Sequence, residues 1–486
     1  MIPALEIAGS QSLAYFGPEL ALLVAAAVVG VLARFRRLDR SEIGELAILG
    51  ASLSVFLGAR LAGWGEVWIF GRALVVDGFA ILFAMLVGVA AVAVLWISLE
   101  SSPPASGDHG WSSAMILLTA LGLDVMAAAA NLWIAYLAVE LASLGLWALS
   151  LAQAGEPPGG ARRAGAVGAS LAMLCGVAWL AGFSQSADYE LVHAGLAGIG
   201  SAAGVPLAAA VAAVLLALPS RVLVAAWGRK DRASPALDAF VAVGFAAAGL
   251  AFSARFLLPV LSTRAAAGRW IEQPGPAWTR VVAITAAAGM TVGNLGALRE
   301  GSVRRLLLAT AAAHVGYALL GVASATDAGL RAALFYLVAS TVGALGAFHG
   351  AALVERARGN DELEAYRGLL RGSSWPVGLG LGVFLLSLAG FPGPVGFPAK
   401  RHVFETSRGT FEGVAIVAAL NIGLAAAAYG RVILRMLERD EGARAVRVRA
   451  YDACFMATLA AATIAFGLDQ EPLLELVKRS IQLLPR

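Results

Sequence analysis

Long apolar runs, each followed by a short polar segment, dominate the pattern of this chain. A helix needs about 20 apolar residues to cross a bilayer core, and its backbone must satisfy its own hydrogen bonds there. The pattern therefore predicts an all-α polytopic membrane protein. We expect about 14 transmembrane helices, near residues 12–33, 43–63, 74–98, 112–128, 130–152, 164–183, 205–227, 236–259, 279–298, 303–323, 329–354, 375–397, 411–436 and 450–468.

Basic residues in the connecting segments alternate as the positive-inside rule describes. Loops after odd-numbered helices are rich in arginine, as in 34–40 and 356–371, whereas 184–204 contains no basic residue. The alternation predicts a multi-pass membrane protein with both termini outside. Residues 471–484, EPLLELVKRSIQLL, carry apolar residues at helical spacing and predict a short surface helix.

The expected helices form a single membrane domain over 1–486. It comprises helices 1–3 (1–110), a first half-channel of helices 4–8 (112–259), a second of helices 9–13 (279–436), and a last helix with a surface helix (450–486). We interpret the half-channels as two pseudo-symmetric five-helix halves. Gly/Pro interruptions at 216–231 and 390–400 predict broken helices 7 and 12, and such paired breaks point to a transport pathway.

Composition supports this class of protein and excludes others. Hydrophobic residues make up 59% of the 486 residues and charged residues 14%, against about 25% charged in soluble domains. The net charge of +4 comes from arginines spread over short loops, which does not indicate nucleic-acid binding. Cys175 and Cys454 lie in apolar runs, so neither a disulfide framework nor a metal–thiolate site is indicated. The amino terminus lacks the basic segment of a cleaved signal peptide.

Ionisable residues inside the membrane cost about 2.5–3.5 kcal/mol each and are functional candidates. Lys400 ends the stretch GFPGPVGFPAK and is one of only three lysines in the chain. Prolines remove backbone donors and break helices, and a desolvated lysine can alternate between charged and neutral forms. The alternative is a lysine that reaches the outer surface beside Arg401 and His402.

Further candidates lie in other apolar helices. Glu140 is a mid-helix proton site or a carboxylate bonded to a neighbouring serine or a helix arginine, and His314 is a proton relay or a packing group. Arg221 follows Pro219 and provides a permanent cation. Accessory candidates are His349 and Asp124. The sequence has no Walker loop, HExxH or CxxC, so we expect no metal or nucleotide site.

Several motifs together resemble one family. They are YLAVELASLGLWAL with Glu140, GNLGALREGSVRRLLLATAAAHVGYALLG (293–321) with His314, LFYLVASTVGALGAFHGAALVE, and LLSLAGFPGPVGFPAKRHVF with Lys400. The chain is similar over nearly its whole length to the antiporter-like membrane subunits of respiratory complex I, in particular the N-type. The resemblance implies that Glu140, His314 and Lys400 lie on a proton pathway. It also places Arg163 where the family has a lysine at the start of helix 6.

Two family lysines are missing. Residues 215–218, where helix 7 of the family carries a lysine, read Leu-Leu-Ala-Leu, and Arg221 is the nearest cation. The lysine position of helix 8 falls at Phe245 and Ala246. The chain therefore departs from the family in the centre of the expected pathway.

The resemblance implies a proton-translocating subunit of an NADH–quinone oxidoreductase, without a cofactor of its own. NADH, FMN, iron–sulfur clusters and quinone are then expected on partner membrane and peripheral subunits. Three alternatives remain: an Mrp-type cation/proton antiporter subunit, a membrane subunit of an energy-converting hydrogenase, and a structural paralogue that no longer pumps. The missing lysines favour the last of these.

Overall fold

The structure is a computed structural model that describes residues 5–7, 11–35, 39–63, 65–100, 109–154, 160–197, 234–265, 268–272, 278–439 and 444–482. Helices make up most of it. They are α1 (Ser12–Tyr15), α2 (Gly17–Phe35), α3 (Arg40–Leu61), α4 (Gly78–Glu100), α5 (His109–Ala128), α6 (Leu132–Ala154), α7 (Gly160–Ser184), α8 (Tyr189–Ala197), α10 (Pro235–Leu261), α11 (Trp278–Arg299), α12 (Val303–Ala323), α13 (Asp327–Arg358), α14 (Trp375–Ala389), α15 (Gly396–Arg408), α16 (Glu412–Leu437), α17 (Ala450–Leu468) and α18 (Glu471–Gln482).

Five strands of three residues each and two 3-10 turns complete the described part. The strands β1 (Leu5–Ile7), β2 (Val67–Ile69) and β3 (Leu74–Val76) form one sheet, in which β1–β2 is parallel and β2–β3 antiparallel. A separate antiparallel pair consists of β4 (Ser262–Arg264) and β5 (Trp270–Glu272). The 3-10 turns η4 and η5 cover Leu363–Tyr366 and Gly372–Ser374. These small elements were not predicted, because three-residue strands leave little periodicity in the sequence.

Twelve helices within the described residues are long and apolar enough to cross a membrane. Each overlaps one of the predicted spans, and α12 and α17 have the predicted bounds. The predicted span 205–227 lies outside the described residues. The span predicted at 375–397 is helical only as far as Ala389, and a second helix, α15, starts at Gly396. The total of fourteen spans stays a prediction.

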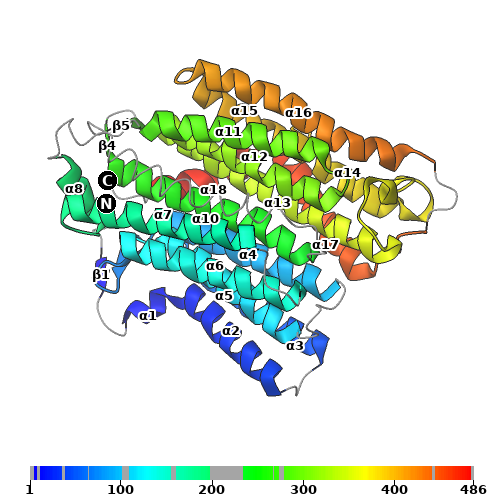
Figure 1. Ribbon diagram of the computed structural model, residues 1–486, viewed down its shortest axis with the longest axis horizontal. Coiled ribbons are helices and arrows are strands. Elements are labelled where there is room, and N and C mark those ends of the chain that lie inside the picture. Colours follow the sequence, from blue (N-terminus) through cyan, green and yellow to red (C-terminus); the bar gives the residue numbers. More distant parts are fainter. Residues whose placement is uncertain are drawn as a thin grey trace.

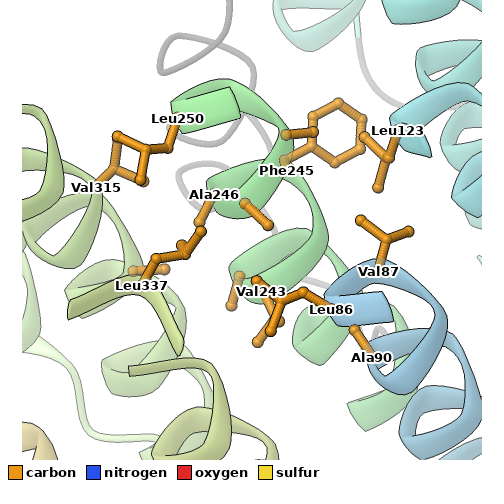
Figure 2. Packing of buried hydrophobic residues seen from close by; sticks show 14 of the residues in the cluster. Leu86, Val87, Ala90, Leu123, Val243, Phe245, Ala246, Leu250, Val315 and Leu337 are labelled. Carbon is orange, nitrogen blue, oxygen red and sulfur yellow. The ribbon is translucent and has the colours of Figure 1, made fainter. Parts of the chain in front are cut away.

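The long helices lie side by side, and α10 runs through the middle of the bundle (Figure 1). It packs against α4 and α5 on one side and against α12 and α13 on the other. The core close-up shows Leu86 and Leu123 meeting one side of α10 while Val315 and Leu337 meet the other (Figure 2). This central position explains why α10 is buried along its length and reads as apolar on every face.

The bundle has two distinct ends. The five strands of the described residues lie at one end of the bundle (Figure 1), which we call the strand end. At the other, the basic end, segments 299–305, 356–374 and 431–449 gather most of the arginines of that half of the chain. Caps fix several helix starts there: the Ser234 hydroxyl accepts the Leu237 N–H, and the Ser302 hydroxyl accepts the Arg305 N–H. Such caps satisfy backbone donors that the first turn leaves free.

Small residues allow two helix pairs to approach closely. A Cβ on Gly122 of α5 would lie 2.6 Å from the Ala142 nitrogen of α6, and one on Gly293 of α11 would lie 2.7 Å from the Ala313 nitrogen of α12. Contact between backbones is the main source of helix association in lipid, where apolar side chains gain nothing by leaving the tails. These contacts position α6, which carries Glu140, and α12, which carries His314.

Candidate functional site

Lys400 lies in the helix α15, just after an interruption between two helices inside the bundle. Helix α14 ends at Ala389, and Gly390 adopts a left-handed conformation with φ of +85°. The chain turns and re-enters a helix at Gly396, so that the Lys400 side chain folds back over the end of α14. A Cβ on Gly390 would approach the Lys400 Cδ to 2.7 Å. Glycine is therefore required there for both its conformation and its size.

The ammonium group of Lys400 is held by backbone oxygens. Its Nζ donates to the carbonyls of Leu388 and Ala389 at 2.9 and 2.8 Å, and the side chain is only 5% exposed. These carbonyls belong to the last turn of α14, where the helix dipole favours a positive charge. The ring of Tyr317 lies 5.2 Å from Nζ, within the range of a cation–π contact.

Lys400 forms no ion pair with any of the described residues. Its positive charge is therefore offset only by dipoles and by one aromatic ring. Burial without a counter-ion penalises the charged form of a lysine, so Lys400 stays a candidate proton carrier. The alternative, a lysine that reaches the outer surface, is not what the structure shows, because Lys400 is buried.

His314 sits near the middle of α12, between two tyrosine hydroxyls. Its Nδ1 lies 2.7 Å from the Tyr336 hydroxyl of α13, and its Nε2 lies 3.1 Å from the Tyr429 hydroxyl of α16. A neutral imidazole donates from one nitrogen and accepts at the other, so a proton can enter at one side and leave at the other. The site thus combines a titratable ring with two hydroxyl partners.

His314 lines two small cavities. One, of about 10 Å³, is lined by His314, Tyr336, Ser340, Ser387 and Lys400. The other, of about 20 Å³, extends from His314 and Thr310 to Ala246 of α10. A cavity needs roughly 10–15 Å³ of this kind of volume to hold a water molecule. The larger cavity can therefore hold one, and both have polar groups that could bind it.

Glu140 is in a different environment from Lys400. It lies in α6, half-buried, and accepts a hydrogen bond of 3.0 Å from the Ser170 hydroxyl of α7. A serine partner is what the alternative to a proton site described, and the role of Glu140 as a proton site stays a prediction. The described contacts do not join Glu140 to Lys400 or His314, which lie on α15 and α12.

The remaining candidates are not gathered around Lys400. His349 faces α17, with its Nε2 3.4 Å from an Asp452 carboxylate oxygen and its ring 4.9 Å from Phe455. Asp124 is buried four residues before the end of α5. Arg163 lies in the first turn of α7, but its side chain is not among those described. Arg221 lies outside the described residues.

Two groups of buried charges were missed from the sequence. Arg255 of α10 donates to both Asp77 oxygens at 3.0 and 2.7 Å and to the Ala127 carbonyl at 2.9 Å. At the basic end, Arg304 lies 3.3–3.6 Å from carboxylates of Asp238, Glu355 and Asp361. The pKa of the Tyr366 phenol beside this second group is raised, mainly because the ring is buried.

These groups left little signal in the sequence. Asp77 precedes a helix like an ordinary capping residue, and arginines near helix ends are expected to face the lipid headgroups. Tyr336 and Tyr429 could have been suspected, because a buried tyrosine hydroxyl usually finds a hydrogen-bond partner. Which partner it finds depends on helix packing. In the described ranges no group of three or more His, Cys, Asp or Glu residues is arranged to hold a metal ion.

Comparison with known proteins identifies the family. Residues 129–424 match the family described as NADH:quinone oxidoreductase/Mrp antiporter, transmembrane. The chain is 30% identical to NADH-quinone oxidoreductase subunit N 2 of Sorangium cellulosum, with 97% of this chain and 98% of the relative aligned. It therefore belongs to the NADH:quinone oxidoreductase/Mrp antiporter transmembrane family, and it is a multi-pass membrane protein.

Solved structures show the same fold. A chain of respiratory complex I from Thermus thermophilus matches with a TM-score of 0.74 and 23% identity, covering 94% of this chain and 98% of that one. A chain of the Mrp complex from a Dietzia species also matches with a TM-score of 0.74, at 19% identity, covering 98% and 97%. Antiporter-like membrane subunits of both kinds thus share this bundle of helices.

Proposed function

We propose that this chain is the N-type membrane subunit of an NADH–quinone oxidoreductase and moves protons as electrons pass from NADH to quinone. The relative from Sorangium cellulosum, named as such a subunit, aligns over nearly its full length. The observation that carries the proposal is the Lys400 ammonium, buried without a carboxylate partner and sharing a cavity with His314. Partner subunits of the complex would hold NADH, FMN, the iron–sulfur clusters and quinone.

The proposed proton step lies between Lys400 and His314. In its charged form Lys400 donates to the two carbonyls at the end of α14. Loss of one proton from Nζ leaves a neutral amine, and a hydroxyl that lines the shared cavity accepts that proton as it passes its own proton on. The imidazole of His314 then relays it between Tyr336 and Tyr429. A change of charge in a neighbouring subunit would drive the step by altering the cost of the buried ammonium.

The larger cavity suggests how the pathway continues across the bundle. It reaches Ala242 and Ala246 of α10, and Ala246 is where the resemblance places a family lysine. A water molecule in this cavity would occupy space that a lysine side chain fills elsewhere in the family. We propose that the basic end faces the cytoplasm of a bacterium and that both termini are periplasmic.

The test compares two lysines in the complete, assembled complex. Lys400→Ala should strongly reduce the number of protons moved per electron in vesicles, while the subunits still co-purify. Lys478→Ala is the matched control, because this lysine is exposed on α18, and it should leave the ratio unchanged. An unchanged ratio for Lys400→Ala would exclude Lys400 as a proton carrier.

Three alternatives are separated by the same preparation. The structural match to an Mrp chain supports a cation/proton antiporter subunit; in that case the purified complex would lack iron–sulfur absorbance and its transport would depend on sodium. A membrane subunit of an energy-converting hydrogenase would instead co-purify with hydrogenase activity. A purely structural paralogue predicts that Lys400→Ala and Glu140→Gln both leave proton transport unchanged.

A further inference from the structure

Two buried carboxyl groups, on the packed helices α2 and α5, lie close enough to interact electrostatically. Glu19 lies in the first turn of α2 and is 6% exposed, and Asp124 lies near the end of α5 and is 2% exposed. Three of their oxygens, Glu19 Oε2 and both Asp124 Oδ atoms, are buried and have no hydrogen-bond partner in the described part of the chain. Neither group pairs with a described basic residue.

This arrangement is not stable with both groups ionised. A carboxylate moved into an apolar interior loses several kcal/mol of solvation, in the order of magnitude that drives such groups to become neutral. A second negative charge close by adds repulsion, and the two groups are close enough to interact electrostatically. If one carboxyl is protonated and donates a hydrogen bond to the other, the repulsion is removed and one of the free oxygens gains a partner.

The charged groups on the helices around Glu19 and Asp124 have other partners or lie away from the pair. Arg255 of α10 is bound to Asp77 at the start of α4 and to the Ala127 carbonyl. Arg40 of α3 donates to the Ser98 and Leu99 carbonyls, and Glu140 of α6 accepts from Ser170. The other charged residues of these helices are exposed or lie at the basic end, namely Arg34, Glu42, Glu45, Arg60, His109 and Asp238.

The pair of Glu19 and Asp124 lies on helices that do not pack against α15, which carries Lys400. Helix α2 packs against α3 and α5, whereas α15 packs against α12, α13 and α16. Figure 1 shows α2 and α15 at opposite edges of the bundle. The outer face of α2 is apolar, with Leu20, Leu23, Val24 and Val28 exposed, as expected of a face in contact with lipid. A hydrophobic reagent dissolved in the membrane can therefore reach α2, the helix that carries Glu19.

We propose that Glu19 and Asp124 form a proton-binding carboxyl pair within the membrane, which holds at least one proton at neutral pH. The pair is a site separate from the one that contains Lys400. It goes beyond the proposed function, because it follows from the burial of two acids and does not require that the chain pumps. Its ligand is a proton shared between two carboxyl oxygens, and release of that proton would leave two interacting negative charges.

The experiment uses dicyclohexylcarbodiimide on the intact complex, followed by peptide mass spectrometry. The carboxyl proton adds to a carbodiimide nitrogen, the carboxyl oxygen bonds to the central carbon, and rearrangement gives a stable N-acylurea without a leaving group. We expect an adduct on Glu19 or Asp124 at pH 7 that diminishes only in alkaline medium. Glu45, exposed on neighbouring α3, is the control and should stay unlabelled.

Variants test whether the two groups act together. In Asp124→Asn the like charge is removed, so labelling of Glu19 should decline at lower pH than in the unaltered chain; identical pH profiles would overturn the pair. The Glu19→Gln/Asp124→Asn double variant should lose an infrared carbonyl band of a protonated carboxyl, a readout that does not depend on access of the reagent.

Two results would overturn the proposal outright. One is the absence of both the adduct and the infrared band at pH 7, which would show that both carboxyls are ionised. The other is protection from labelling by sodium chloride, compared with choline chloride at the same pH, which would identify a bound metal cation in place of the proton. Neither result bears on proton transport through Lys400, so failure of this proposal and failure of the proposed function are distinguishable.

Discussion

Two buried cations, Arg255 and Lys400, show how different a membrane-embedded positive charge can be. Arg255 is 2% exposed and forms a bidentate pair with Asp77, which is fully buried. Its guanidinium also lies 4.8 Å from the Phe79 ring. Lys400 is equally buried, but its partners are two backbone carbonyls and the ring of Tyr317. Arg255 thus has a counter-ion, whereas Lys400 has none among the described residues.

The difference separates a structural charge from a switchable one. A guanidinium keeps its proton under all ordinary conditions, and its carboxylate partner fixes that state further. Arg255 joins the middle helix α10 to Asp77 at the start of α4 and to Ala127 of α5. The Lys400 amine can lose its proton, and its carbonyl partners tolerate the neutral form. Burial is common to both residues, and a counter-ion among the described residues is what distinguishes them.

The largest expected effect is on Arg255. Arg255→Met should destabilise the chain by about 3–5 kcal/mol, because the Asp77 carboxylate is left buried without its cation. The measurement is the thermal unfolding of the assembled complex together with the yield of this subunit within it. The double variant Asp77→Asn/Arg255→Met should recover part of the loss, since asparagine can still accept the Ala80 N–H that Asp77 accepts now. A double variant as unstable as the single one would contradict this account.

Lys400→Arg sharpens the comparison by placing an arginine in the Lys400 environment. The guanidinium keeps the positive charge and can donate to the carbonyls of Leu388 and Ala389, but it cannot release a proton. We expect proton transport to fall as far as in Lys400→Ala, with a smaller loss of thermal stability than in that variant. The readouts are the proton-to-electron ratio in vesicles and the unfolding temperature. Transport at the unaltered level would show that a fixed positive charge is sufficient.

The smallest expected effect concerns the relay. In His314→Gln the amide can still bond to the hydroxyls of Tyr336 and Tyr429, so stability should change by no more than about 1 kcal/mol. The amide cannot take up a proton, and proton transport should slow severalfold. His314→Phe is the comparison, since it also removes both hydrogen bonds and should be the less stable variant. Equal transport in His314→Gln and the unaltered chain would restrict His314 to a packing role.

The sequence predicted the membrane class and most helices well. The spans over 303–323 and 450–468 were predicted to the residue, because apolar runs bounded by polar residues mark helices in lipid directly. The run 375–397 was less well predicted, since its turn after Ala389 depends on Gly390 and on the prolines that follow. Lys400 stood out for a simple reason: a lysine at a proline-rich break is costly unless it has a function.

The partners of each candidate could not be predicted in the same way. Nothing in the sequence around Glu19 says that it lies near Asp124, which lies more than a hundred residues later, and nothing pairs Asp77 with Arg255. For Glu140 both a serine partner and a proton site were considered, and the Ser170 contact emerged only from the packing of α6 on α7. The side chain of Arg163 and the whole of Arg221 are not described, so their predicted roles stay predictions.

By itself, the sequence determined that this protein is a multi-pass membrane protein and where most of its described helices run. These properties follow from local composition, because lipid selects each helix on its own residues. Only the tertiary structure decided which of the buried charges have a counter-ion. That property depends on contacts between distant helices. It distinguishes Arg255, which is paired with Asp77, from Lys400, whose partners among the described residues are two backbone carbonyls and the ring of Tyr317.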